Sequence, residues 1–163
     1  CSISCVRNPF PDEKLKPFAD LVGANLMGGR MGRRDMSSAR MIFADCSGAS
    51  MVDSVFCGAH FDCATLDSAN IGRSDLTEAS LCYASLRGTA LNSVKLCRAT
   101  LIGADLSRAD LSSSDLTDAN LTDANLTDAN LKRTNLLRAN LKGAILKGAI
   151  MTGATMPDGT IHD

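Results

Sequence analysis

Residues 116–130 read LTDANLTDANLTDAN, which is one five-residue unit repeated three times. A period of five matches neither the 3.6 residues per turn of an α-helix nor the two-residue alternation of a β-strand. Because a fixed internal period defines the architecture of a chain, we follow the register outward from this stretch. Every fifth residue from Leu21 to Met156 is apolar, with no insertion or deletion, which gives 28 consecutive units.

The residues around each apolar position predict how one unit folds. A small side chain, usually alanine, stands two positions before it, with Arg34 as the clear exception, and the residue between them is often Asp or Asn. Alternate side chains of an extended segment share a face, so the small and the apolar residue point inward. The other two residues must turn the chain, and glycine fills the second of them nine times. Glycine there suits the positive φ of a type II turn.

This A(D/N)LXX pattern resembles that of the pentapeptide-repeat family over residues 19–158. The resemblance implies an all-β fold, a right-handed quadrilateral β-helix with four units per coil and therefore about seven coils. Leucine and alanine would fill the interior, and backbone ladders would join coils about 4.8 Å apart. The expected organisation is a cap over residues 1–18, the β-helix over 19–158 and a tail over 159–163.

The residues before the first unit predict a short cap. Residues 10–18 read FPDEKLKPF, in which a proline and two acids suit the first turn of a helix and the second proline ends it. We predict a capping helix at about 11–17, and we expect the first coil to be covered by Phe10, Leu15 and Phe18.

The opposite end of the solenoid looks poorly capped. The chain reads MPDG at residues 156–159 and then has four more residues. An exposed sheet edge invites pairing with another chain. We therefore expect either that the tail folds under the last coil or that two molecules meet there as an end-to-end dimer.

The polar residues predict no catalytic or metal site. His60 and His162 lie far apart in the solenoid, and neither has a nucleophile and an orienting acid as partners. The Asp and Asn residues recur with the repeat, where short polar side chains bond local backbone. The cysteines lack zinc-ligand spacing. We predict that the protein is not an enzyme, uses no cofactor or metal, and inserts into no membrane, because no apolar run approaches the roughly 20 residues of a span.

Some pentapeptide-repeat proteins resemble B-DNA in shape and charge and bind DNA gyrase as decoys, which gives an alternative function. The net charge of −1, from 17 basic and 18 acidic residues, argues against it. The acids of residues 101–130 and the cations of residues 131–148 also form belts around the rod, whereas a mimic needs acid along its length. We therefore predict no nucleic-acid partner and keep gyrase binding as the alternative.

Apolar and cysteine side chains at the turn positions gather on one face. Seven of these twelve residues recur there at a spacing of one coil, where an even spread would put three. A contiguous exposed apolar stripe is typical of a contact surface, for a protein partner or for the N-terminal segment folded back. We call it the apolar stripe, and it consists of Val22, Ile42, Phe43, Cys63, Cys82, Tyr83 and Ile102.

Seven cysteines are many for a chain of 163 residues. Cys63 and Cys82 fall on adjacent coils of one face, within the Cα range of a disulfide. Cys1 and Cys5 belong to the cap, where we favour a disulfide, and that bond implies an oxidising compartment. The surface thiols of the first pair define a second alternative function, that of a redox-responsive protein.

Long uninterrupted repeats, a helical N-terminal cap and an ending like MPDG are similar to those of cyanobacterial and chloroplast thylakoid-lumen members of the family. That resemblance implies the thylakoid lumen, with the cytoplasm as the alternative. The expected function is that of a non-catalytic scaffold or protein-interaction protein with an unknown protein partner.

Overall fold

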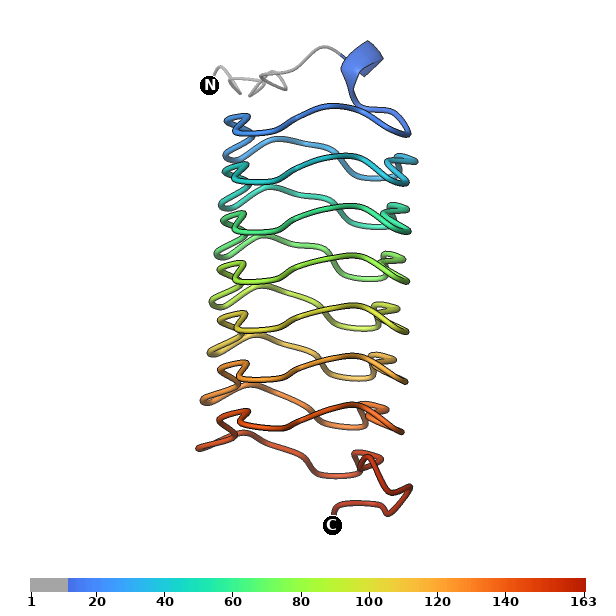
Figure 1. Cartoon of the computed structure of the whole chain (residues 1–163), viewed down its shortest axis with the longest axis vertical. Coiled ribbons are helices and arrows are strands. Elements are labelled where there is room, and N and C mark those ends of the chain that lie inside the picture. The colour runs from blue at the N-terminus through green and yellow to red at the C-terminus, as the bar shows by residue number, and fades with distance from the viewer. Residues whose placement is uncertain (1–11) are drawn as a thin grey trace, which may run out of the picture.

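The structure is a computed structural model, and it describes residues 12–163. In this part of the chain the only helix is the 3₁₀ helix η1, Asp12–Lys14. The remaining residues wind into a rod of stacked coils, with the two ends of the described segment at opposite ends of the rod (Figure 1). No helix within the described residues is long and apolar enough to cross a membrane.

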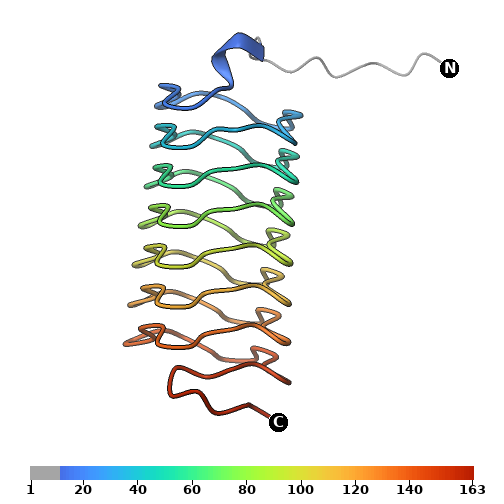
Figure 2. The same cartoon turned by 90° about the vertical axis from the view of Figure 1, so that its right-hand side faces the viewer.

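Parallel β-bridges fix the length of one coil at twenty residues. The first bridge joins Asp20 to Arg40, the last joins Asn135 to Thr155, and every parallel bridge between them also links residues twenty positions apart. Each unit contributes a single bridge residue and no longer strand. Four five-residue units fill one coil, so the rod has four sides, and its coils stack regularly from end to end (Figure 2). The four-sided solenoid predicted from the repeat is confirmed.

The interior of the rod is built from the two inward positions of each unit. The apolar position is buried in every unit from Leu21 to Leu136. Phe56 and Phe61 replace leucine in two successive units, and their rings meet edge to face with centroids 5.3 Å apart. This packing confirms that leucine and alanine positions face inward, as the pleat predicts.

One corner of the interior contains buried hydroxyl groups that the sequence pattern did not single out. Ser54, Ser74, Ser114 and Thr134 occupy the small position there. The Ser114 hydroxyl donates to the Leu91 carbonyl at 2.6 Å and accepts from the Val94 N–H at 3.2 Å. These bonds satisfy backbone groups at a corner where the usual turn hydrogen bond is long or replaced.

The second turn residue of every unit but the last, from Gly23 to Gly153, adopts a left-handed backbone conformation, whether or not it is glycine. The φ angle is 58° at Phe43, 57° at Tyr83 and 58° at Ser113, and it is also positive at the nine glycines of the repeat. The predicted positive φ is thus confirmed and extends to side chains for which this region costs about 1–2 kcal/mol. Hydrogen bonds between coils hold the turns, as where the Ser113 N–H donates to the Lys132 carbonyl at 2.9 Å.

The N-terminal cap is smaller than predicted. A helix at about 11–17 was expected, and the structure has only η1 there. Leu15 is buried against the first coil as expected. Phe18 is 77% exposed and does not cover that coil, because it occupies a second turn position with φ of 57°, from which side chains point outward. Phe10 lies outside the described residues.

The C-terminal tail folds back along one side of the last coil. Ile161 forms an antiparallel bridge with Thr155, and the His162 N–H donates to the Ala154 carbonyl at 2.8 Å. On the other sides the interior is less well covered, since Leu141 and Leu146 are only half-buried. Both alternatives foreseen for this end therefore stay open, because the tail covers only part of the coil.

Candidate functional site

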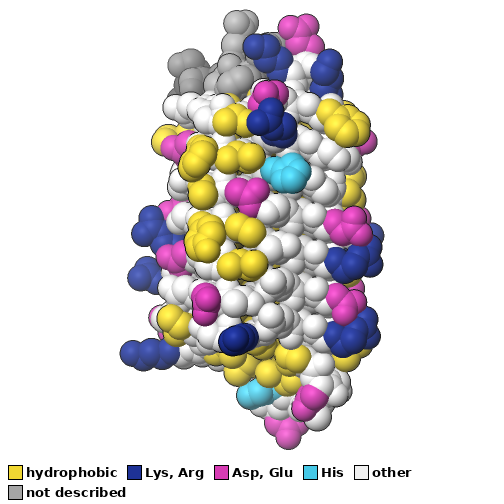
Figure 3. Space-filling view, viewed as in Figure 1, with side chains coloured by type: hydrophobic (Ala, Val, Ile, Leu, Met, Phe, Trp, Pro, Cys, Tyr) yellow, Lys and Arg dark blue, Asp and Glu magenta, His cyan; other side chains and the backbone are white. Residues whose placement is uncertain are grey.

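The apolar stripe lies along one corner of the rod, on the wall seen in Figure 3. It consists of two neighbouring columns of turn residues. Backbone bonds hold the columns in register, because the Phe43 N–H donates to the Asp62 carbonyl at 3.1 Å and the Tyr83 N–H to the Ile102 carbonyl at 2.8 Å. First turn residues form one column, Val22, Ile42, Cys82 and Ile102, and second turn residues form the other, Phe43, Cys63 and Tyr83.

The side chains of the two columns project from the rod to different extents. Phe43 and Tyr83 are each 66% exposed, whereas Ile42, Cys82 and Ile102 are half-buried. The wall formed by the two aromatic side chains therefore stands beside a shallow apolar floor. This relief is a feature that a partner can recognise by shape as well as by polarity.

Gly103 makes room for the ring of Tyr83. A β-carbon at that glycine would lie 2.6 Å from two ring carbons of the tyrosine, so the ring rests directly over the glycine. A larger residue at this position would push the ring away from the rod. The exposure of the tyrosine is thus set by the residue one coil further on.

Asp62 interrupts the floor of the stripe with a carboxylate. One oxygen accepts hydrogen bonds from the Ser80 hydroxyl and, at 3.1 Å, from the Cys82 N–H. The other oxygen lies 3.8 Å from the His60 Nδ1. The carboxylate is therefore held in place, and it gives the stripe a formal negative charge between apolar neighbours.

The thiols of the stripe are free. Cys63 and Cys82 lie on adjacent coils, and the Cys63 N–H donates to the Cys82 carbonyl at 2.9 Å, but no disulfide joins the two side chains. The Cys82 sulfur lies 3.6 Å from the Ser80 hydroxyl, so it leans toward the strand residue of its own coil, whereas Cys63 is exposed. The disulfide considered for this pair is therefore not formed. Cys1 and Cys5 lie outside the described residues.

The remaining cysteines are poorly placed for thiol chemistry. Partial burial raises the pKa of the Cys57 and Cys97 thiols, and hydrogen bonds to the carboxylates of Asp75 and Asp115 raise it further. Burial raises the pKa of Cys46 to about 12. Since the thiolate is the reactive form, these three side chains are weak nucleophiles at neutral pH.

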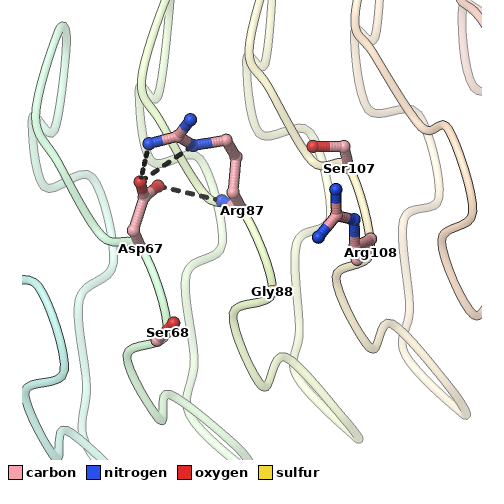
Figure 4. Close-up of a pocket in the computed structure, with 6 residues that line it drawn as sticks. All are labelled: Asp67, Ser68, Arg87, Gly88, Ser107 and Arg108. Atoms are coloured by element: carbon pink, nitrogen blue, oxygen red, sulfur yellow. Dashed lines mark hydrogen bonds and ion pairs between the residues drawn. The ribbon is translucent and has the colours of Figure 1, made fainter.

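A second candidate is a hollow of about 280 Å³ on another corner (Figure 4). Arg87 Nε donates to Asp67 Oδ2 at 2.9 Å across it, and Arg108 extends into it from the next coil. Partial burial alone would raise the pKa of Asp67, but hydrogen bonds from Arg87 and from the Ser85 hydroxyl outweigh it and lower that pKa. The strongest charges of the hollow therefore satisfy each other, and the apolar stripe is the better candidate.

Ion pairs between coils neutralise much of the surface charge. In each pair the acid precedes the cation by twenty residues, and the cation is largely exposed to solvent. Each such pair contributes little to stability, but it places a cation beside an acid along the rod. The pairs are Asp20–Arg40, Asp53–Arg73, Asp67–Arg87, Asp75–Lys95, Glu78–Arg98 and Asp118–Arg138.

The histidines form no catalytic constellation. His60 lies beside Asp62, and the His162 Nδ1 lies 3.0 Å from the Asp163 carbonyl. Within residues 12–163, no group of three or more His, Cys, Asp or Glu side chains could hold a metal ion.

Comparison with known proteins shows similarity to repeat proteins. The family model for pentapeptide repeats, eight copies, matches residues 39–77, 59–96, 74–112 and 114–153. HetL, a pentapeptide repeat protein involved in heterocyst differentiation regulation in Nostoc sp. strain PCC 7120, is 32% identical over 90% of this chain and 86% of its own, with a TM-score of 0.41. A search of curated proteins finds no match.

Two further solved structures are similar. Trypsin-treated QnrB1, a plasmid-mediated fluoroquinolone resistance protein, is 23% identical over 84% of this chain and 69% of its own, with a TM-score of 0.78, which shows a shared fold alone. A pentapeptide repeat protein of the Arabidopsis thaliana thylakoid lumen is 25% identical over 97% and 78%, with a TM-score of 0.34. Because the family model matches most of the chain, this protein belongs to the pentapeptide-repeat family, whose members form right-handed quadrilateral β-helices.

Proposed function

We propose that this protein is a non-catalytic scaffold that binds another protein through the apolar stripe. The observation that carries the proposal is the exposed pair Phe43 and Tyr83 above a half-buried apolar floor. Contiguous exposed apolar side chains mark contact sites, and aromatic residues are favoured at the centres of interfaces. Both side chains also stand at left-handed positions where glycine fits more easily, so the fold gains little from them.

The partner surface is tested by affinity capture from an extract of the source organism. The variant Phe43→Ser/Tyr83→Ser removes the aromatic wall. The matched control, Met27→Ser/Val55→Ser, removes two exposed apolar side chains that lie outside the stripe. We expect the first variant alone to lose a captured protein. If both variants capture the same proteins as the unchanged chain, the stripe is not the binding surface.

An inhibition assay separates this proposal from the DNA-mimic alternative. The ion pairs between coils set cations along the rod beside the acids that a mimic would need. We therefore expect no effect of the purified protein on DNA supercoiling by gyrase at low micromolar concentration. Inhibition or protection of gyrase in that range would favour the mimic.

We also propose that two copies meet end to end through the last coil. Ile145 and Ile150 are exposed at strand positions that most other units fill with a polar residue. The N–H groups of Leu141, Leu146 and Met151 have no acceptor within the described residues, whereas the equivalent groups of earlier coils donate to the next coil. Sedimentation equilibrium should show a dimer that Ile145→Asp/Ile150→Asp dissociates, and a monomer at high micromolar concentration would contradict it.

We propose the thylakoid lumen as the compartment, with the cytoplasm as the alternative. The support is the long uninterrupted repeat and the MPDG ending at residues 156–159, which resemble those of lumenal members of the family. Protease protection in isolated thylakoids tests this location. The protein should resist protease until the membranes are opened, and digestion in intact thylakoids would exclude the lumen.

A further inference from the structure

The apolar stripe presents its side chains at a regular spacing along the rod. Successive coils lie about 4.8 Å apart, and one turn of an α-helix rises about 5.4 Å. Over the three steps from Ile42 to Ile102 the two periods diverge by only about 2 Å. A helix laid parallel to the rod can therefore place one side chain per turn against each of these coils.

An extended strand fits the same surface less well. Its same-side residues repeat every 6.8 Å or so, which exceeds the coil spacing by about 2 Å at every step. Backbone bonds beneath the stripe run from one coil to the next, since the Gly23 N–H donates to the Ile42 carbonyl at 2.8 Å and the Cys63 N–H to the Cys82 carbonyl at 2.9 Å. This face of the rod therefore presents no free strand edge to which a strand of a partner could add.

The relief of the stripe suits a cylinder. The half-buried side chains of Ile42, Cys82 and Ile102 form a floor, and Phe43 and Tyr83 rise along one side of it. Figure 3 shows these apolar side chains as two adjoining columns on one face of the rod. A helix can lie on the floor with its flank against the aromatic wall, as an amphipathic helix does in an apolar groove.

Asp62 determines the charge that such a helix must carry. Its carboxylate lies in the floor between Ile42 and Cys82, where a bound helix would remove it from water. Covering a carboxylate without a counter-charge is unfavourable, and a paired Lys or Arg offsets that cost. The neighbouring His60 lies to one side, 3.8 Å from the carboxylate, and Arg40 is paired with Asp20.

We propose that the partner of the stripe presents an amphipathic α-helix that lies parallel to the rod and places a Lys or Arg over Asp62. This inference rests on the proposed function, because it names the kind of partner that the stripe binds. A second copy of residues 12–163 cannot supply the helix, since the only helix described there is the three-residue η1.

Synthetic helices test the proposal directly. One stapled peptide of about 15 residues, roughly four turns, carries an apolar residue on each turn and Arg at the turn that faces Asp62. A second peptide has Glu in place of the Arg, and a third has the first composition in scrambled order. Fluorescence anisotropy measures the Kd of each peptide for the unchanged protein, for Asp62→Asn and for Phe43→Gly/Tyr83→Gly.

We expect the Arg peptide to bind at least about tenfold more tightly than the Glu or scrambled peptide. The Asp62→Asn variant, which keeps the shape and the acceptor oxygen, should reduce the preference for Arg over Glu to about twofold. The double glycine variant should weaken binding at least about tenfold. Equal affinity for all three peptides, or binding unchanged in the double glycine variant, overturns the proposal.

The helix and the scaffold function can be refuted separately. If affinity capture finds a protein that depends on Phe43 and Tyr83 but the Arg peptide does not bind, the helix is wrong and the scaffold function stands. If neither the capture nor the peptide depends on these side chains, both proposals are lost.

Discussion

Ser112 and Ser113 occupy the two turn positions of one unit, and they provide a matched test of the turn geometry. Ser113 has a φ of 58°, whereas Ser112 is not among the residues with positive φ. The Ser112 N–H donates to Asp110 Oδ1 at 3.1 Å and the Ser113 N–H to the Lys132 carbonyl at 2.9 Å. Both bonds use the backbone, so replacing either serine with alanine or glycine changes mainly the conformational preference of the chain.

The expected free energies follow from that difference in φ. At position 113 glycine removes a left-handed cost of about 1–2 kcal/mol and adds roughly 0.5–1 kcal/mol of unfolded-chain entropy. Ser113→Gly should therefore be more stable than Ser113→Ala by about 0.5 kcal/mol. At position 112 there is no left-handed cost, so only the unfolded-chain entropy of glycine matters. Ser112→Gly should therefore be less stable than Ser112→Ala by roughly 0.5–1 kcal/mol.

Subtracting the glycine–alanine difference at position 112 from that at position 113 cancels the contribution of unfolded-chain entropy. What is left is the cost of the left-handed conformation, about 1–2 kcal/mol. Urea unfolding of the four variants, followed by circular dichroism, measures it as a difference of differences. In thermal unfolding the same quantity corresponds to roughly 2–8 °C in Tm for a chain of this size. If glycine is less stable than alanine by the same amount at both positions, the assigned turn geometry is wrong.

Four further perturbations probe the interior, the corner, the surface and the thiols. Leu96→Ala should destabilise by about 3–5 kcal/mol, because the side chain is fully buried, and a loss under about 1 kcal/mol in urea unfolding would place that side chain outside the core. Ser114→Ala should lower the free energy of unfolding by about 1–3 kcal/mol, whereas Ser114→Thr, which keeps the hydroxyl, should lower it much less. Equal losses of stability in the two variants would contradict a role for the hydroxyl. The lowered pKa of Asp67 contributes stability that is present above its unfolded pKa and is lost as the pH falls through the lower folded pKa. Asp67→Asn should therefore weaken the decline in stability during acid unfolding, and an unchanged pH profile would argue against the ion pair. Cys97 should be alkylated more slowly at neutral pH in the folded chain than in urea, because its pKa is raised, and equal rates would contradict that shift.

The period of five was enough to predict the architecture because it repeats the inward position without a break. Leu76, Leu96 and Leu116, one coil apart, are fully buried as the pattern requires. The positive φ of the second turn position could be read from its glycines. The apolar stripe could also be predicted, because residues twenty positions apart must share a wall.

Other features depend on side-chain directions that the period does not contain. Phe18 looked like a cap residue, but its turn position directs the ring outward. The Cys63–Cys82 disulfide looked feasible from the coil spacing, but the two residues occupy different turn positions, both thiols are free, and the Cys82 sulfur lies 3.6 Å from the Ser80 hydroxyl. The hydroxyl residues of the Ser114 corner recur at multiples of twenty residues, but the period does not show that they bond backbone groups.

The alkylation rate of Cys63 in the free and the partner-bound protein reports whether a partner occupies the apolar stripe. This exposed thiol lies between Phe43 and Tyr83 in the column of second turn residues, so any partner on the stripe covers it. We expect partner binding to slow its alkylation at least about tenfold while the rate at Cys97, on another wall, stays unchanged. A Cys63 that reacts equally fast in the complex would show that the partner binds elsewhere.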